Sequence, residues 1–152
     1  MFTDKSLMLC DNTNFFGGNG AALIGDVIDL GTGGFERVAA GMPLALNVRI
    51  ATGMTGGTSL LIYLATDSTL SGGNLASANT GILQSNTVPR ADLTKGASLI
   101  LPLASGSMVL YERYLQLAIV RTGTSTAGAL HAFLSFEQDD WHAYKSARPK
   151  LT

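Results

Sequence analysis

The sequence predicts an all-β fold, an antiparallel β-sandwich of jelly-roll type. Apolar and polar residues alternate with a period of two in several short segments, whereas the 3.6-residue period of an amphipathic helix hardly appears. Glycine-rich turns separate these segments, and the 152 residues include 18 glycines. Roughly seven or eight short strands with such turns, and without a convincing helix, are typical of sandwiches and jelly rolls.

Three segments in the middle of the chain read as strands. LALNVRI at residues 44–50 is half-buried, with Leu44, Leu46, Val48 and Ile50 on one face and Ala45, Asn47 and Arg49 on the other. TSLLIYLATD at 58–67 is apolar on both faces, as in a central strand or one with a covered outer face. SLILPLA at 98–104 contains Pro102, which cannot donate to a ladder, and this predicts an edge strand.

The stretch RYLQLAIVRTGTSTAGALHAFLSF at 113–136 predicts two strands joined by a turn within TGTSTAG. We expect its inward residues to be Leu115, Leu117 and Ile119, then Leu130, Ala132, Leu134 and Phe136. The opposite face of the first strand carries Tyr114, Ala118 and Val120, which is unusually apolar for a face that meets water. Something is therefore expected to cover this second face. KSLMLCD at 5–11 and ALIGDVIDLG at 22–31 are weaker strand candidates.

The length fits a single domain over residues 1–152, with irregular arms at about 11–20 and about 139–152. Charged residues make up only 14% of the chain, compared with about 25% in ordinary soluble domains. The formal net charge of -1 indicates neither nucleic-acid binding nor a trap for acidic ligands. No apolar run is long enough for a signal peptide or a spanning helix, so we expect a soluble protein made in a cytoplasm.

Catalytic patterns are missing from the sequence. GGNGAALIG lacks the third glycine of a dinucleotide-binding loop, and no G-x-S-x-G elbow occurs. The two histidines, His131 and His142, are too few for a multi-histidine metal cage, and the single Cys10 cannot build a zinc site. Asp139 and Asp140 are adjacent and would point to opposite faces. We therefore expect no enzyme, no metal and no cofactor.

Three function classes stay open: a protein that docks on another protein, a carbohydrate-binding module, and an enzymatic or metal-binding jelly roll. A carbohydrate-binding module is a small sandwich that needs aromatic platforms, and Trp141 with Tyr144 could stack a sugar ring. The same residues, with His142 and Arg148, fit a docking tail at least as well, because aromatics and arginine are common anchors between proteins. An enzymatic or metal-binding jelly roll is the third alternative.

Several segments, taken in order, carry a resemblance to a known family. They are DVIDLG, GMPLALNVRIAT, GGTSLLIYLATDS, VPRADLTKGASLILPL, RYLQLAIVRTGTSTAGAL and FEQDD, from about Asp26 to Gln138. Together they resemble the small capsid cement, or decoration, proteins of tailed double-stranded DNA bacteriophages. This resemblance implies a jelly roll without catalytic residues that binds the major capsid protein on the outer surface of the virion. It would be made in the bacterial host cytoplasm and would contact neither nucleic acid nor membrane.

A capsid cement protein would have a partner that covers the apolar outer face of the strand with Tyr114, Ala118 and Val120. A sister subunit would bury the face, and a homodimer is favoured over a trimer because isologous dimers are the commonest closed assemblies. Anchor residues without an obvious place in the core form the candidate partner interface: Phe15, Phe16, Tyr114, Trp141, His142, Tyr144 and Arg148. For the two phenylalanines the alternative is that they fold back and plug an open end of the sandwich.

Overall fold

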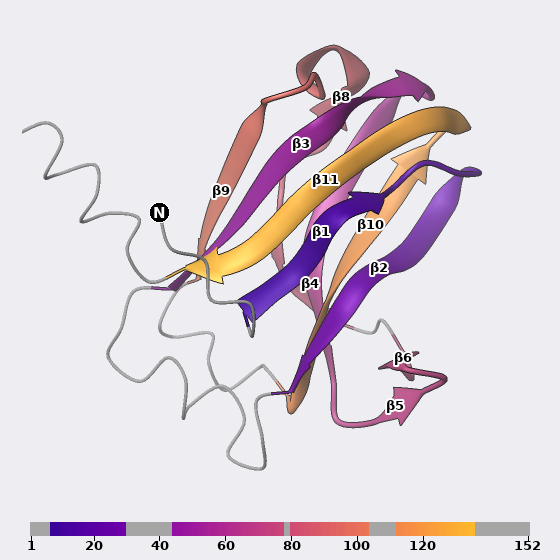
Figure 1. The fold of residues 1–152 in the computed structure, drawn as a ribbon. Coiled ribbons are helices and arrows are strands. Elements are labelled where there is room, and N and C mark those ends of the chain that lie inside the picture. Colours follow the sequence, from indigo (N-terminus) through magenta and orange to yellow (C-terminus); the bar gives the residue numbers. More distant parts are fainter. Residues whose placement is uncertain (1–6, 30–43, 78–79, 104–111, 136–152) are drawn as a thin grey trace, which may run out of the picture.

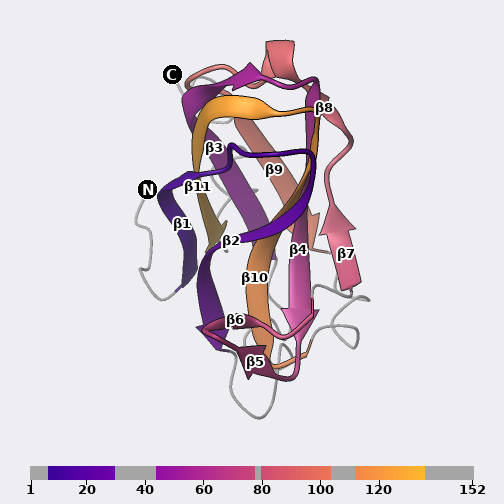
Figure 2. The ribbon, with the colours of Figure 1, turned by 90° about the vertical axis from the view of Figure 1, so that its right-hand side faces the viewer.

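Two antiparallel sheets pack face to face in the computed structural model, which describes residues 7–29, 44–77, 80–103 and 112–135 (Figures 1 and 2). The first sheet has the order β1-β11-β3-β9, and the second has the order β2-β10-β4-β7 with β8 paired to β4. The strands are β1 (Met8–Asn14), β2 (Gly20–Asp29), β3 (Leu44–Gly56), β4 (Ser59–Asp67), β5 (Leu70–Ser71), β6 (Asn74–Leu75), β7 (Thr80–Gln84), β8 (Val88–Pro89), β9 (Ser98–Leu103), β10 (Tyr114–Thr122) and β11 (Ser125–Ser135).

This strand order is that of a jelly roll, so the predicted fold class is confirmed. β1, β3, β9 and β11 lie in one sheet, while β2, β4, β7 and β10 lie in the other, and the chain crosses repeatedly between the two. A short 3-10 helix, η2 (Arg90–Asp92), follows β8. In the part of the chain that the structure describes, no helix has the length and apolar character to cross a membrane.

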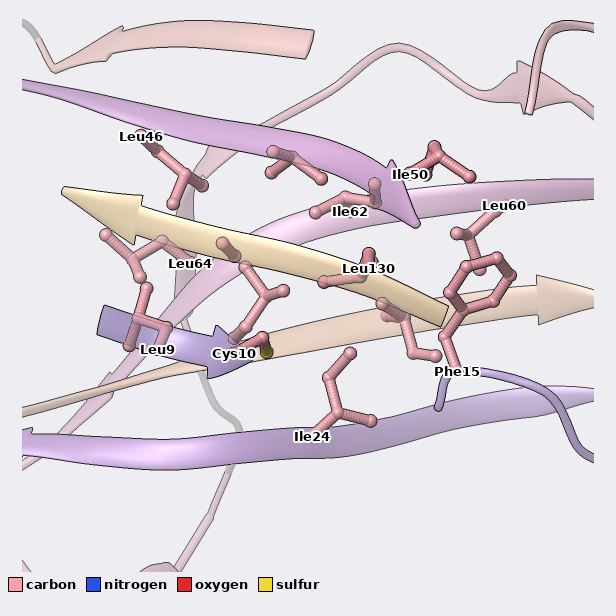
Figure 3. Packing of buried hydrophobic residues seen from close by; sticks show 14 of the residues in the cluster. Leu9, Cys10, Phe15, Ile24, Leu46, Ile50, Leu60, Ile62, Leu64 and Leu130 are labelled. Atoms are coloured by element: carbon pink, nitrogen blue, oxygen red, sulfur yellow. The ribbon is translucent and has the colours of Figure 1, made fainter. Parts of the chain in front are cut away.

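The core fills the space between the two sheets (Figure 3). Leu115, Leu117 and Ile119 of β10 are fully buried there, as the alternation in the sequence predicts. β11 faces them with a second predicted set, in which Leu130 and Ala132 are likewise fully buried. Among the described strands β9 is the last of its sheet and pairs with β3 alone, which agrees with the edge position that Pro102 predicts.

The predicted irregular arm at about 11–20 is wrong for half of its length. β1 continues to Asn14 and β2 begins at Gly20, so only residues 15–19 connect them. The polar run that suggested an arm belongs to an edge strand, whose pairing with β11 shifts register twice and whose side chains there are largely exposed. Likewise, the sequence predicts a turn in the glycine-rich stretch TGMTGGT at 52–58, but β3 runs on through Gly56, so most of that stretch is strand. The GTGG segment at 31–34 and the tail from 139 lie outside the described residues.

Gly25 permits a close approach between β1 of the first sheet and β2 of the second. It has φ +76° and lies in β2, whose register with β10 shifts between Leu115 and Leu117. A Cβ atom at Gly25 would collide with the carbonyl oxygen of Leu9 and the thiol of Cys10 in β1. Only glycine combines this left-handed backbone with so close an approach of the neighbouring strand.

Candidate functional site

Part of the apolar outer face of β10 is covered by the chain itself. Ala118 is fully buried and packs with Ala65 of β4 and Leu75 of β6, and the half-buried Tyr63 and Tyr114 border this cluster. The β5–β6 hairpin lies across the second sheet, where β6 contacts β2 and β10 (Figure 2). Ala118 therefore needs no partner to cover it, whereas Tyr114 and Val120, the other two residues of this predicted face, are half-buried. The sequence predicts only a turn in the glycine-rich stretch SGGNLASANTG at 71–81, but this stretch contains β6, whose Leu75 supplies the cover.

Polar side chains fasten this hairpin to the sheet. Gln116 is fully buried in β10, and its Nε2 donates to Asn74 Oδ1 at 2.8 Å and to the Gly25 carbonyl at 3.2 Å. Its Oε1 accepts the backbone N–H of Leu75 at 3.1 Å. Every polar atom of the buried amide thus has a partner, and such satisfied networks fix a single arrangement.

Asp67 organises the start and end of the same segment. Its Oδ1 accepts the backbone N–H of Thr69 at 3.1 Å, and its Oδ2 accepts that of Ser77 at 2.7 Å. Both hydroxyls donate to the carboxylate as well. The backbone N–H groups of Thr69 and Ser77 stabilise the charged form and hold the pKa of Asp67 below its ordinary value.

Tyr114, one of the predicted interface residues, is engaged within the chain. The guanidinium of Arg113 lies 5.0 Å from the centre of its ring. Arg113 also donates to both carboxylate oxygens of Asp29, at 2.9 and 3.0 Å. This hydrogen-bonded carboxylate raises the pKa of Arg113 above its ordinary value. Tyr114 is half-buried between these contacts and the small cluster around Ala118.

Phe15 is fully buried, so its predicted role at a partner interface is wrong. The ring enters the space between the sheets at one end of the sandwich, near Leu60 and Leu130 (Figure 3). Its backbone N–H donates to the carbonyl of Gly128 at 3.0 Å. A Cβ atom at Gly128 would collide with the ring, so a glycine in β11 makes the room that Phe15 occupies. Phe15 therefore folds back and plugs an open end of the sandwich, as the alternative expectation for the two phenylalanines has it.

Phe16, by contrast, projects outward with 44% of its surface exposed. The loop that carries it is held on three sides. Arg121 donates to the carbonyls of Phe15 and Gly18, at 3.0 and 2.6 Å. Gly17 exchanges backbone and side-chain hydrogen bonds with Ser125, and Asn19 accepts the backbone N–H of Gly123 at 2.8 Å. The result is an exposed aromatic side chain on a preorganised support, which is typical of a protein-docking anchor.

A groove of about 310 Å³ lies on the outer face of the first sheet, lined by Arg49, Ile50, Ala51, Lys95, Gly96 and His131. His131 and Arg49 are direct cross-strand neighbours in β11 and β3. Sequence reasoning placed Arg49 and His131 on outward strand faces but did not bring them together. Only the strand register does so, and register between distant strands is not readable from alternation alone.

A smaller apolar cavity, of about 130 Å³, lies between the sheet edges and is lined mainly by Val48, Ile50, Ile62, Val88, Leu93 and Leu99.

Burial raises the pKa of the Cys10 thiol to about 12, so the thiol stays neutral at ordinary pH. Among the described residues no group of three or more potential metal-ligating side chains gathers. Trp141, His142, Tyr144 and Arg148 lie outside those residues, and with them the aromatic pair on which the carbohydrate-binding alternative depended.

A family model described as Bbp16 matches residues 19–134. The matched region begins just before β2 and ends one residue before the end of β11, so it includes nearly all of both sheets except β1. No curated protein matches the chain.

Proposed function

The chain belongs to the Bbp16 family, and from this premise we propose that it is a bacteriophage capsid cement protein. It would bind the outer surface of the major capsid protein lattice and tie neighbouring capsomers together. The ordered resemblance from about Asp26 to Gln138 supports this proposal, and most of those segments fall inside the matched region. The jelly-roll strand order agrees with what the resemblance implies for the fold.

The observation that carries a docking role is the contrast between Phe15 and Phe16. One ring is fully buried and fixes the loop, while the next is 44% exposed on that fixed loop. A single exposed apolar side chain is common on a monomer, so a docking role is supported by the ordered loop that presents Phe16 rather than by exposure alone. Because Arg121 and Ser125 already order the loop, little conformational entropy is lost on binding.

The mechanism we propose is mechanical. Each contact with a shell subunit can be modest. For a protein that touches two or more subunits, the second contact forms at high effective concentration, and the overall affinity can rise by about 10² or more. A protein that binds only the assembled lattice stabilises that lattice by linkage. The shell would then withstand the pressure of packaged DNA.

Self-association belongs to this proposal, with a dimer favoured over a trimer. It rests on the resemblance, because Leu75 covers the Ala118 surface that first suggested a partner. Sedimentation of the purified protein at micromolar concentration tests it, and a species of 15.8 kDa alone would count against it. Cosedimentation with expanded, empty heads tests the cement role itself.

A further inference from the structure

The groove on the outer face of the first sheet gathers basic side chains from three separate segments. Arg49 comes from β3 and His131 from the facing position of β11. Lys95 comes from the loop before β9, and that loop is tied to β3 because Gly96 donates its backbone N–H to the Ile50 carbonyl at 2.8 Å. Ile50 returns a hydrogen bond to Ala97 at 2.9 Å. These backbone hydrogen bonds hold the loop with Lys95 next to Arg49 and His131.

Two of these cations are available to a ligand. Arg49 and Lys95 are exposed, and neither has an ion-pair partner among the residues that the structure describes. The acid that contacts His131 is Asp11, whose Oδ1 lies 3.3 Å from His131 Nδ1 and whose side chain is 74% exposed. It belongs to β1, on the opposite side of β11 from Arg49, because β11 lies between β1 and β3. Asp11 therefore does not neutralise the Arg49 side of the groove.

His131 adds an imidazole to the lining of the groove. Its Nδ1 accepts the backbone N–H of Asn12 at 3.0 Å, so the neutral ring carries its proton on Nε2. The groove then offers a guanidinium, an ammonium and an imidazole N–H, all of which donate and none of which accepts. A carboxylate is the chemical group that such donors complement.

An apolar residue adjoins the groove on the same face. Ile100 of β9 pairs with Asn47, two residues along β3 from the pairing of Arg49 with Ser98. Two residues along a strand is the same face of the sheet, and Ile100 is 36% exposed. A surface that combines basic donors with an exposed aliphatic side chain suits a protein segment better than a free anion.

We infer that this groove binds carboxylate side chains from an acidic segment of a protein partner. The inference deepens the proposed function, since the partner there is the major capsid protein. DNA is the less suitable ligand, because the chain has a formal net charge of -1 and the groove offers few basic groups to track a phosphate backbone. Phe16 would supply an apolar anchor, and the groove would supply charge complementarity and orientation.

A peptide probe tests the groove without any capsid. The full-length protein is titrated with a hexaglutamate peptide, and NMR follows the backbone amides of Gly96 and His131. We expect these amides to shift, with the affinity falling roughly tenfold between low salt and about 0.5 M salt. In the double variant Arg49→Gln, Lys95→Gln the affinity should fall by about tenfold or more. Arg90→Gln, an exposed arginine of η2 that does not line the groove, should bind as the wild type does.

Equal affinity in the double variant, equal binding of hexaglutamine, or tighter binding of a short DNA duplex would each overturn the inference. Thermal melts of all variants confirm folding, because these substitutions are on the surface. Cosedimentation with expanded heads separates the two proposals. If the wild type binds heads and the double variant binds equally well, the inference that the groove binds acidic side chains is wrong. The proposed cement role then stands. If the wild type does not bind heads, the cement role fails, while the peptide titration still decides the groove.

Discussion

Gln116 of β10 and Asn74 of β6 meet through a hydrogen bond of 2.8 Å, from Nε2 to Oδ1, beneath the hairpin that covers the second sheet. The hairpin that this contact holds explains the apolar Ala118 on the outer face of β10. The inner face of β10 packs against the first sheet, and Ala118 packs under Leu75. The chain thus closes with its own hairpin a surface whose composition suggested a sister subunit.

Replacing Gln116 with leucine should destabilise the fold by about 1–3 kcal/mol, because the Leu75 N–H and its neighbours would lose their buried partner. Urea unfolding measures this loss. Asn86→Leu, at an exposed position, serves as the control and should change the free energy of unfolding by less than about 0.5 kcal/mol. Equal stability of the two variants would mean that the hairpin is not fastened through Gln116.

Asp67→Asn should lower Tm by several degrees at pH 7, because an amide cannot accept from both Thr69 and Ser77 as the carboxylate does. The pKa of Asp67 is lower in the folded protein, so its stabilising effect is complete above the unfolded pKa of about 4 and is lost as pH falls below it. The Tm difference between wild type and variant should therefore shrink between pH 5 and pH 2.5. A difference that stays constant over this range would contradict the assignment.

Much of the fold could be predicted from the sequence, since alternation fixes which side of a strand is buried. Leu115, Leu117 and Leu130 illustrate this, as does the edge position of β9. Gln116 and Phe15 could not be predicted in the same way. A glutamine within an apolar strand and a phenylalanine beside glycines acquire their roles from segments far away in the chain, here Asn74 and Gly128. The basic groove depends on the pairing of Arg49 with His131, which is a tertiary property.

Phe15→Ala should cost about 3–5 kcal/mol of stability, because it empties a fully buried aromatic site at the end of the sandwich. Gly128→Ala should also destabilise the protein, since the added methyl would collide with the Phe15 ring. Thermal denaturation compares both with Phe16→Ala, the matched control at an exposed neighbour. A Phe15→Ala protein that melts with the wild type would show that the ring does not plug the core.

Cys10 should react with a thiol reagent only when the protein unfolds. Burial raises its pKa to about 12, and the thiolate is the reactive form. We expect negligible labelling by a disulfide reagent in native buffer at pH 8 and rapid labelling in urea. The same experiment on Cys10→Ala gives the background. Fast labelling of the native protein would contradict the buried position of β1 against β2.

Cosedimentation with expanded, empty phage heads tests the proposed cement role most directly. We expect the wild type to pellet with the heads and to saturate at a fixed ratio to the major capsid protein. Phe16→Ala should keep the wild-type Tm within about a degree and bind the heads at least about tenfold more weakly, as the loss of an exposed aromatic anchor predicts. A wild-type protein that stays in the supernatant at every concentration would contradict the cement role.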